Sequence, residues 1–276
     1  MIEFHADDYG MFPYSSKRII KCINEGLING ISLMPNGKCF DECMKLFSEL
    51  SLKKVRMSVH LNIMTETPLS KPEEVTELTD DKGCFNVTYQ KLLLACVKPD
   101  LRKRLKKQIK IELSRQIDAC LPYLPADEGL RIDSHRHFHM VPWCFDLITE
   151  IIKEKGLRLS YIRMIREKPA FYRGILQFEY FKPVNIIKAL LLNSFSLVDR
   201  LKHRDLYENH SADFTSILFS GCMTERNLRI ILKNIKENPT DIREDVEIMF
   251  HPGAVKEPED LRRVFDQEDR RYFSDP

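Results

Sequence analysis

Residues 2–10 have the sequence I-E-F-H-A-D-D-Y-G, in which apolar residues at positions 2, 4 and 6 alternate with polar residues at positions 3, 5 and 7. A period of two predicts a β-strand, and Gly10 and Pro13 predict its end. Asp7 and Asp8 then lie together at the carboxyl end of this strand. Two adjacent carboxylates repel each other and raise one pKa unless a cation lies between them. A divalent metal ion is the commonest such cation, so this strand end is the first candidate site.

Histidines occur at the ends of later predicted strands. His60 lies near the end of a predicted strand over residues 55–63, and His251 directly follows one over residues 246–250. A single histidine on an apolar strand is weak evidence for a site, but Asp or His at several strand ends is stronger evidence.

A further predicted strand, over residues 132–140, contains four polar residues at alternate positions. They are Asp133, His135, His137 and His139. Side chains at alternate positions of a strand point to the same side. We therefore expect up to three imidazoles on one face, with a carboxylate that can orient one of them.

Predicted strands alternate with predicted helices along the whole chain. Further strands are expected over residues 31–34 and 157–164, and the clearest helix covers residues 99–121, where Leu or Ile recurs every fourth position. This alternation, without a linker rich in Gly or Ser, predicts one α/β domain over residues 1–276 with a mostly parallel sheet. About seven strand–helix units suit a TIM-like (β/α) barrel, distorted or incomplete. Barrel enzymes build their sites at the carboxyl ends of the strands, where the candidate residues lie.

The composition excludes several classes of protein. With 276 residues, 43% hydrophobic residues and a net charge of +2, the chain is typical of a soluble protein with no nucleic-acid or membrane partner. Its eight cysteines form no C-x-x-C pair, which argues against a zinc knuckle and favours a reducing compartment. Its longest apolar run, residues 186–197, is broken by Lys188, Asn193 and two serines and is far shorter than the ~20 residues that span a bilayer. We expect a cytoplasmic protein without a signal peptide.

The candidate residues suit a metal-dependent hydrolase. Two imidazoles and one carboxylate leave positions open where a water molecule can bind and lose a proton near neutral pH. One aspartate of the pair can bind the metal, and the other can accept the proton. Hydrolysis of an amide also needs an acid for the departing amine, for which His251 is the candidate.

Four motifs in order resemble those of the YdjC-like carbohydrate deacetylases, a chitooligosaccharide deacetylase-like family. The motifs are A-D-D-Y-G (6–10), S-V-H-L (58–61), D-S-H-R-H-F-H-M-V-P (133–142) and F-H-P-G (250–253). The stretches at 32–37 and 212–221 fit the family as well, so the resemblance covers nearly the whole chain. Tyr9 and Ser58 depart from the usual Phe and Gly, and neither change removes a candidate ligand.

The resemblance implies a distorted (β/α) barrel that removes an acetyl group from an N-acetylated amino sugar. It implies metal binding by Asp8, His60 and His135. Asp7 matches the general base, and His251 lies where the family's acid is expected.

Two further residues, His137 and His139, match positions near the family's site, with roles that the motif does not separate. Asp133, the carboxylate on the same predicted strand, is expected to orient a ligand or contact substrate. Two nitrogens and one oxygen suit zinc, whereas family members are often described with magnesium, so the expected cofactor is one divalent ion, Mg²⁺ or Zn²⁺.

Two other functions fit the same residues. One is a different metallohydrolase on a barrel, of the phosphoesterase or amidohydrolase type, because a fold does not fix a reaction. The other is a non-catalytic sugar-binding protein that keeps the metal site. The long loop at 64–86 and the aromatic-rich stretch 165–185 are candidates to flank the substrate, an N-acetylated oligosaccharide. The alternative for the aromatic residues is that they pack in the core. A homodimer is the expected oligomer.

Overall fold

The computed structural model describes residues 1–48, 55–174, 182–220, 223 and 225–253. Seven strands form one parallel sheet in the order β5-β4-β3-β2-β1-β7-β6. The strands are β1 (Ile2–Tyr9), β2 (Gly30–Leu33), β3 (Arg56–Leu61), β4 (Leu130–Ser134), β5 (Leu159–Ile162), β6 (Asp213–Thr215) and β7 (Val246–Phe250). The predicted parallel α/β architecture is confirmed.

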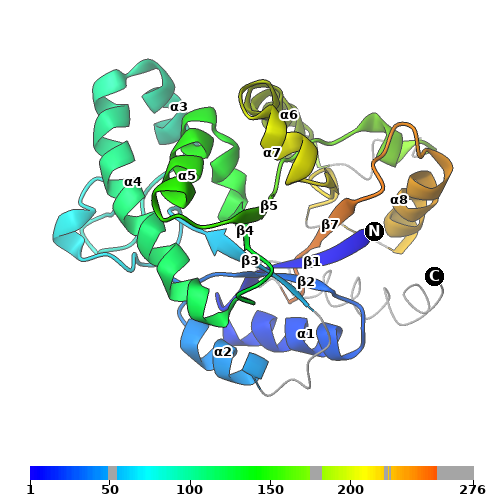
Figure 1. The fold of residues 1–276 in the computed structure, drawn as a ribbon, viewed down its shortest axis with the longest axis horizontal. Coiled ribbons are helices and arrows are strands. Elements are labelled where there is room, and N and C mark those ends of the chain that lie inside the picture. Colours follow the sequence, from blue (N-terminus) through cyan, green and yellow to red (C-terminus); the bar gives the residue numbers. More distant parts are fainter. Residues whose placement is uncertain (49–54, 175–181, 221–222, 224, 254–276) are drawn as a thin grey trace.

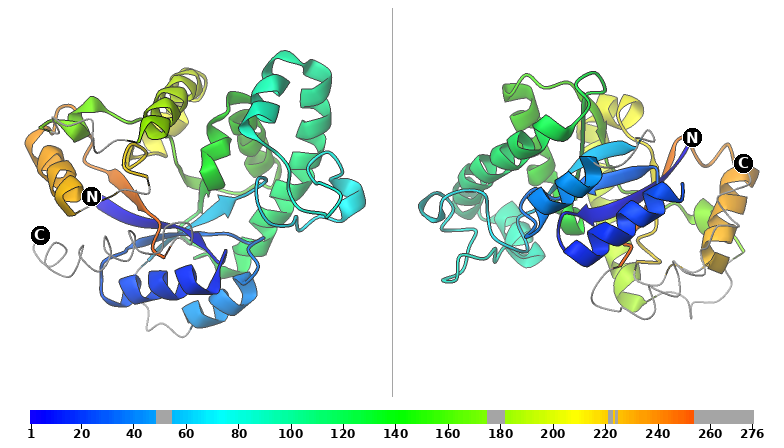
Figure 2. Two further views of the ribbon diagram at one scale, coloured as in Figure 1. Left: turned by 180° about the vertical axis from the view of Figure 1, so that it is seen from behind. Right: turned by 90° about the horizontal axis from the view of Figure 1, so that it is seen from below.

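Helices surround the strands (Figure 1). They are α1 (Pro13–Asn24), α2 (Phe40–Ser48), α3 (Tyr89–Val97), α4 (Pro99–Cys120), α5 (Pro142–Glu154), α6 (Pro183–Lys202), α7 (Arg204–Asn209) and α8 (Glu225–Glu237). Short 3₁₀ helices are η1 (Pro72–Glu74), η2 (Leu121–Tyr123), η3 (His135–Met140) and η4 (Pro169–Tyr172). Helices α1 and α2 lie side by side on one side of the sheet, and α3, α4 and α5 group together elsewhere around it (Figure 2).

The long helix α4 follows directly from its sequence pattern. Leu105, Ile109, Leu113 and Ile117 recur every four residues and are fully buried, so this stripe attaches the helix to the core. On its polar face, Lys110 pairs with Glu150 and Glu154 at the surface. These ion pairs give Lys110 acidic partners on the neighbouring helix α5.

The sheet is curled, because side chains from distant strands meet. Strands β4 and β7 are separated by three strands, yet donor atoms of Asp133 and Glu247 lie within 4.8 Å of each other and of His5 on β1. The two edge strands nearly meet as well, since Ile162 N–H donates to the carbonyl oxygen of His210, just before β6, at 2.7 Å. The architecture is therefore an incomplete barrel.

The first strand occupies a central place in this barrel. It pairs with β2 on one side and with β7 on the other, in a register that sets Ile2 opposite Val246 and Ala6 opposite Phe250. The alternation in β1 has the predicted effect, because the polar residues at positions 3, 5 and 7 are buried inside the barrel. His5 is held there by Glu3 at 2.7 Å and Ser32 at 2.6 Å.

The prediction of one strand over residues 132–140 is wrong. Strand β4 ends at Ser134, and His135–Met140 form the 3₁₀ segment η3. Arg136 and His137 have positive φ angles of 53° and 61°, a left-handed conformation that reverses the chain and is incompatible with a strand. The alternating histidines imitate a strand pattern without forming one.

Several elements were absent from the sequence-based prediction. They are α3, which follows the predicted long loop, and α7 and β6, which precede the final helix and strand. Helix α3 is capped by Thr88, whose side-chain oxygen accepts a hydrogen bond from Lys91 N–H. Phe171 in the aromatic stretch is fully buried in the core, which favours packing over sugar binding; Tyr180 lies outside the described residues. Within the described part of the chain, no helix has both the length and the apolar character needed to cross a membrane.

Candidate metal centre and active site

A distortion of β1 brings two successive carboxylates into one cavity. Successive side chains of a regular strand point to opposite faces, so Asp7 and Asp8 would normally diverge. Here Asp8 has a φ of 67°, and the register with β2 shifts between Ala6 and Tyr9. An irregularity of this kind re-aims side chains. As a result, both carboxylates line the same cavity of about 630 Å³.

The turn after this distortion depends on two glycines. Gly10 has a φ of 97°, which L-residues with a side chain rarely adopt. Gly37, in the turn after β2, lies against it so closely that an added Cβ would be 2.2 Å from the Gly10 carbonyl oxygen. The motifs around residues 6–10 and 32–37 therefore support each other and fix where Asp8 emerges.

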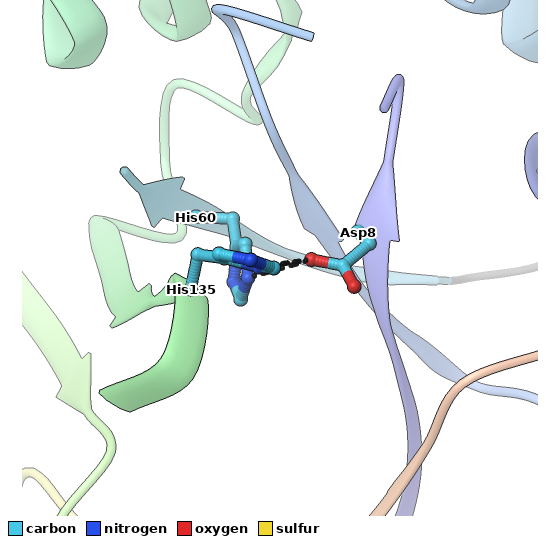
Figure 3. Close-up of side chains that lie close together, drawn as sticks. All are labelled: Asp8, His60 and His135. Carbon is cyan, nitrogen blue, oxygen red and sulfur yellow. Dashed lines mark hydrogen bonds and ion pairs between the residues drawn. The ribbon is translucent and has the colours of Figure 1, made fainter. Parts of the chain in front are cut away.

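Asp8, His60 and His135 converge in this cavity (Figure 3). Their donor atoms all lie within 4.8 Å of one another. Asp8 Oδ1 is 2.8 Å from Nδ1 of His135 and 3.1 Å from Nε2 of His60. Burial of Asp8 opposes ionisation, but the two imidazoles outweigh it and hold the pKa of Asp8 well below its usual range. The structure thus brings together the three residues predicted to bind a metal.

Asp133 determines which nitrogen of His60 faces the cavity. Asp133 Oδ1 lies 2.6 Å from Nδ1 of His60, so this nitrogen donates to Asp133 and Nε2 faces Asp8. Burial would lower the pKa of His60, but Asp133 and the other carboxylates raise it to about 10. A carboxylate that fixes the tautomer of a ligand histidine is common in metal sites.

These residues fit a divalent metal ion. Within the described residues, the buried Nε2 of His60 makes no hydrogen bond although Asp8 lies close to it, as expected of a donor atom oriented toward a shared ion. Two other groups of acids and histidines, His5-Asp133-Glu247 and Asp7-His60-Asp133, are also compact. They are less suited, because hydrogen bonds to Glu3 and Ser32 already occupy both nitrogens of His5, and Arg163 binds both oxygens of Asp7.

Arg163 holds Asp7 in place and is a residue that the sequence interpretation missed. Its two terminal nitrogens donate to the two oxygens of Asp7 at 2.8 Å each, and it also lies 3.0 Å from Asp133 and pairs with Glu247. Burial would raise the pKa of Asp7, but Arg163 and then His60 lower it to about 2. The signal was present, because Arg163 directly follows an apolar strand whose carboxyl end faces the same rim.

His251 lines the cavity, as predicted from its place after β7. Burial lowers the pKa of His251, and the positive charge of Lys188 acts in the same direction, against Asp8 and Asp7. The imidazole is therefore neutral near pH 7 in the free protein. Lys188, which the sequence interpretation treated only as a break in an apolar run, lines the cavity as well.

The other two histidines of η3 have different environments. His139 is fully buried and bridges Ser134 Oγ at 2.6 Å and the Arg163 carbonyl oxygen at 2.8 Å, so it stabilises the turn and does not line the cavity. His137 does line the cavity, and burial holds its pKa well below the usual range. The expectation that His135, His137 and His139 share one face is wrong, because the left-handed residues rotate them apart.

The sequence profile of one family, described as YdjC-like protein, matches residues 1–276. The chain belongs to the YdjC-like family. Thus the family expected from the four motifs is confirmed, and the candidate site lies at those motifs.

Curated YdjC-like relatives are similar over different lengths. A carbohydrate deacetylase of Clostridium beijerinckii is 28% identical over 167 residues, which cover 59% of this chain and 61% of the relative. A carbohydrate deacetylase of Thermoanaerobacter pseudethanolicus is 24% identical over 91% of this chain and 80% of its own length. A chitooligosaccharide deacetylase of Enterobacter sp. (strain 638) is 24% identical over 59% of each chain.

A solved structure shares the fold. A protein from Enterococcus faecalis V583, described as a candidate cellobiose-phosphate cleavage protein, matches with a TM-score of 0.65 at 15% identity, covering 98% of this chain and 90% of its own. At this identity the likeness concerns the fold alone. It supports the incomplete-barrel architecture, in agreement with the curled seven-stranded sheet.

Proposed function

We propose that this YdjC-like protein is a metal-dependent hydrolase that removes the acetyl group from an N-acetylated amino sugar or short chitooligosaccharide. The observation that supports this most directly is the convergence of Asp8, His60 and His135 beside Asp7 in one cavity. The names of the curated relatives support the substrate class. The cavity volume also lies within the usual range for small-molecule sites, roughly 300–1,000 Å³.

Each residue has a proposed role in amide hydrolysis. Asp8, His60 and His135 would hold one divalent ion, which when bound polarises a carbonyl group and lowers the pKa of water toward neutrality. Asp7 would accept the proton of the water that adds to the acetyl carbon. Its low pKa keeps it ionised and ready to do so at neutral pH.

His251 would supply the proton that the departing sugar amine needs. Because burial keeps this imidazole neutral in the free protein, it would take up a proton from solvent and pass it to the nitrogen as the carbon–nitrogen bond breaks, and Asp7 would afterwards return the water's proton to solvent. The products are acetate and the free amino sugar. Asp133 would act on the reaction only through its hold on His60.

The test is release of free amine from N-acetylglucosamine, chitobiose and chitotriose. Metal-stripped protein would be re-loaded with zinc, magnesium or cobalt, and the stripped protein and an Asp8→Ala variant would serve as controls. A metal-dependent signal with any substrate is the expected result, and it would identify the ion and preferred chain length. Bound metal without amine release from any of the three would contradict the proposal. Release of phosphate from a phosphate monoester by the same metal-loaded protein would then favour a phosphoesterase instead.

A further inference from the structure

Lys188 is a cation in the candidate active site that has no ion-pair partner within the part of the chain that the structure describes. It lies on α6, on the side that faces the cavity, and is half-buried. Among the described residues, its ammonium group has no hydrogen bond and no ion pair. The other lysine near this cavity, Lys38, differs, because it pairs at 3.2 Å with the lining residue Glu66.

The carboxylates near Lys188 already have other partners. Asp7 binds Arg163 through both oxygens, and Asp8 contacts two imidazoles. The buried Glu167 accepts hydrogen bonds from the Tyr172 hydroxyl and from Ile217 N–H. Lys188 is therefore not needed to neutralise these three described carboxylates.

An unpaired ammonium in such a place is costly to stability. Burial removes water from it and lowers the pKa of Lys188, although Asp7, Glu167 and Asp8 oppose this. A charge that is partly desolvated without a partner is usually found where a ligand supplies the partner. The group that completes Lys188 is thus expected to come from outside the chain.

The position of Lys188 in the cavity places it near the end of the substrate that would react. It shares the cavity with Asp7 and His251, the two groups proposed to act on opposite sides of the scissile amide. Its charge also reaches the imidazoles of His137 and His251, whose pKa values it helps to lower. A sugar hydroxyl far from the amide would not lie among these residues.

We propose that the Lys188 ammonium group donates a hydrogen bond to the carbonyl oxygen of the substrate's acetyl group and stabilises the negative charge that develops there. This inference rests on the proposed deacetylation. As the water oxygen bonds to the carbonyl carbon, the π-electron pair moves to the carbonyl oxygen, which becomes anionic. When the carbon–nitrogen bond breaks, the pair returns and the amine leaves with the proton from His251. Lys188 keeps its own proton throughout.

The first test removes the charge of residue 188 and keeps a side chain of similar length. Lys188→Met should lower kcat by about 10²–10³, the usual effect of losing one donor to an oxyanion, with KM changed by less than about threefold. Lys188→Arg should retain part of the activity because it keeps the charge. The matched control is Lys202→Met, since Lys202 ends the same helix but pairs with Asp146 at the surface. An unchanged kcat in Lys188→Met, or a rise in KM alone, would overturn the proposal.

A second measurement does not require turnover. A methylphosphonamidate of glucosamine mimics the tetrahedral intermediate, and wild type should bind it about 10²-fold more tightly than Lys188→Met does. Zinc affinity should not fall in this variant, because a neighbouring positive charge has been removed. Equal binding of the mimic by both proteins would refute the role of Lys188.

Chemical rescue distinguishes a chemical role from a structural one. Ethylammonium should restore part of the kcat of Lys188→Ala, whereas tetramethylammonium, which cannot donate a hydrogen bond, should not. Wild type that neither turns over N-acetylated sugars nor binds the mimic would refute the proposed function and this inference with it. Active wild type together with fully active Lys188 variants would refute the inference alone.

Discussion

Asp133 and His60 lie directly opposite each other in the register of β4 and β3, and their side chains meet at 2.6 Å. Because both positions are set by the same strand pairing, the orientation of the imidazole is fixed by the sheet itself. Nδ1 is committed to Asp133, and only Nε2 remains for Asp8 and a metal ion. The candidate metal centre is therefore preorganised by a hydrogen bond formed inside the barrel.

Replacing Asp133 by Asn should weaken metal binding. The amide oxygen can still accept a hydrogen bond from Nδ1 of His60 but carries no charge, so this hydrogen bond is weaker, and zinc affinity should fall by about 10–100-fold. Isothermal titration of the stripped protein with zinc measures this. Asp146→Asn, at a surface ion pair, is the control and should bind as wild type does. Equal affinity in the Asp133 variant would show that the contact does not support the metal.

Replacing Asp7 by Asn should separate metal binding from turnover. Asp7 is bound by Arg163 and not by His135, so its loss leaves the three candidate ligands in place. Zinc affinity should stay within about threefold of wild type, whereas kcat should fall by at least about 10²-fold because the base is gone. Titration and amine release together check this. Retained turnover would rule out Asp7 as the base.

Replacing Arg163 by Lys should reduce both stability and kcat. Lysine keeps the charge but cannot form two parallel bonds to Asp7, so the base is held less precisely and kcat should fall about tenfold or more. Arg131→Lys is the control, because Arg131 bonds both oxygens of the buried Glu3, through one nitrogen, but lines a different cavity. Urea unfolding and kcat should show a stability loss in both variants and a kcat loss only in the first. Normal kcat in Arg163→Lys would contradict the positioning role.

Replacing Asp199 by Asn should stabilise the protein at alkaline pH. Asp199 is fully buried on α6 without a hydrogen bond to either oxygen among the described residues, and burial raises its pKa from 3.8 to about 8. The folded state therefore holds its proton up to about pH 8, whereas the unfolded chain releases it near pH 4. This raised pKa makes wild-type stability fall as the pH rises through that window.

The asparagine variant lacks this titration. It should be more stable than wild type by on the order of 1–3 kcal/mol at pH 8, with the difference shrinking toward pH 4. Urea unfolding at a series of pH values provides the measurement. A difference that stays constant from pH 4 to pH 8 would show that Asp199 does not titrate as its burial requires.

Where the local sequence pattern agrees with the tertiary structure, the sequence was sufficient to predict the helices, the strands and the candidate metal ligands. The strand over residues 246–250 and the helix from Pro99 were predicted almost to the residue, because alternation and four-residue periodicity reflect burial in the barrel and its helices. Asp8, His60 and His135 were found for the same reason, since parallel strands end at one rim.

The failures have a common physical origin in backbone conformations set by distant residues. The turn after Ser134 depends on Ser134 Oγ, which accepts from His139 N–H, and on the Tyr89 hydroxyl, which donates to the Arg136 carbonyl oxygen. No local pattern reveals such contacts. The irregularity at Asp8, which allows both aspartates to reach the cavity, is equally invisible in the sequence.

Charged residues within apolar segments were a neglected signal. Arg163 follows the apolar end of β5, and Lys188 interrupts the apolar sequence of α6. A charge that is retained in such a segment must have a partner inside the protein or in a ligand. Arg163 has protein partners, and Lys188 has none among the described residues.

The central place of β1 has a consequence for synthesis. Its residues are the first of the seven strands to leave the ribosome, but its neighbour β7 is the last. In a nascent chain, β1 therefore lacks one of its two neighbouring strands until residues 246–250 have been translated, and this long-range pairing favours slow folding. A polypeptide stalled before that point carries every candidate metal ligand and still lacks the strand that pairs with residues 2–6, directly before Asp7 and Asp8.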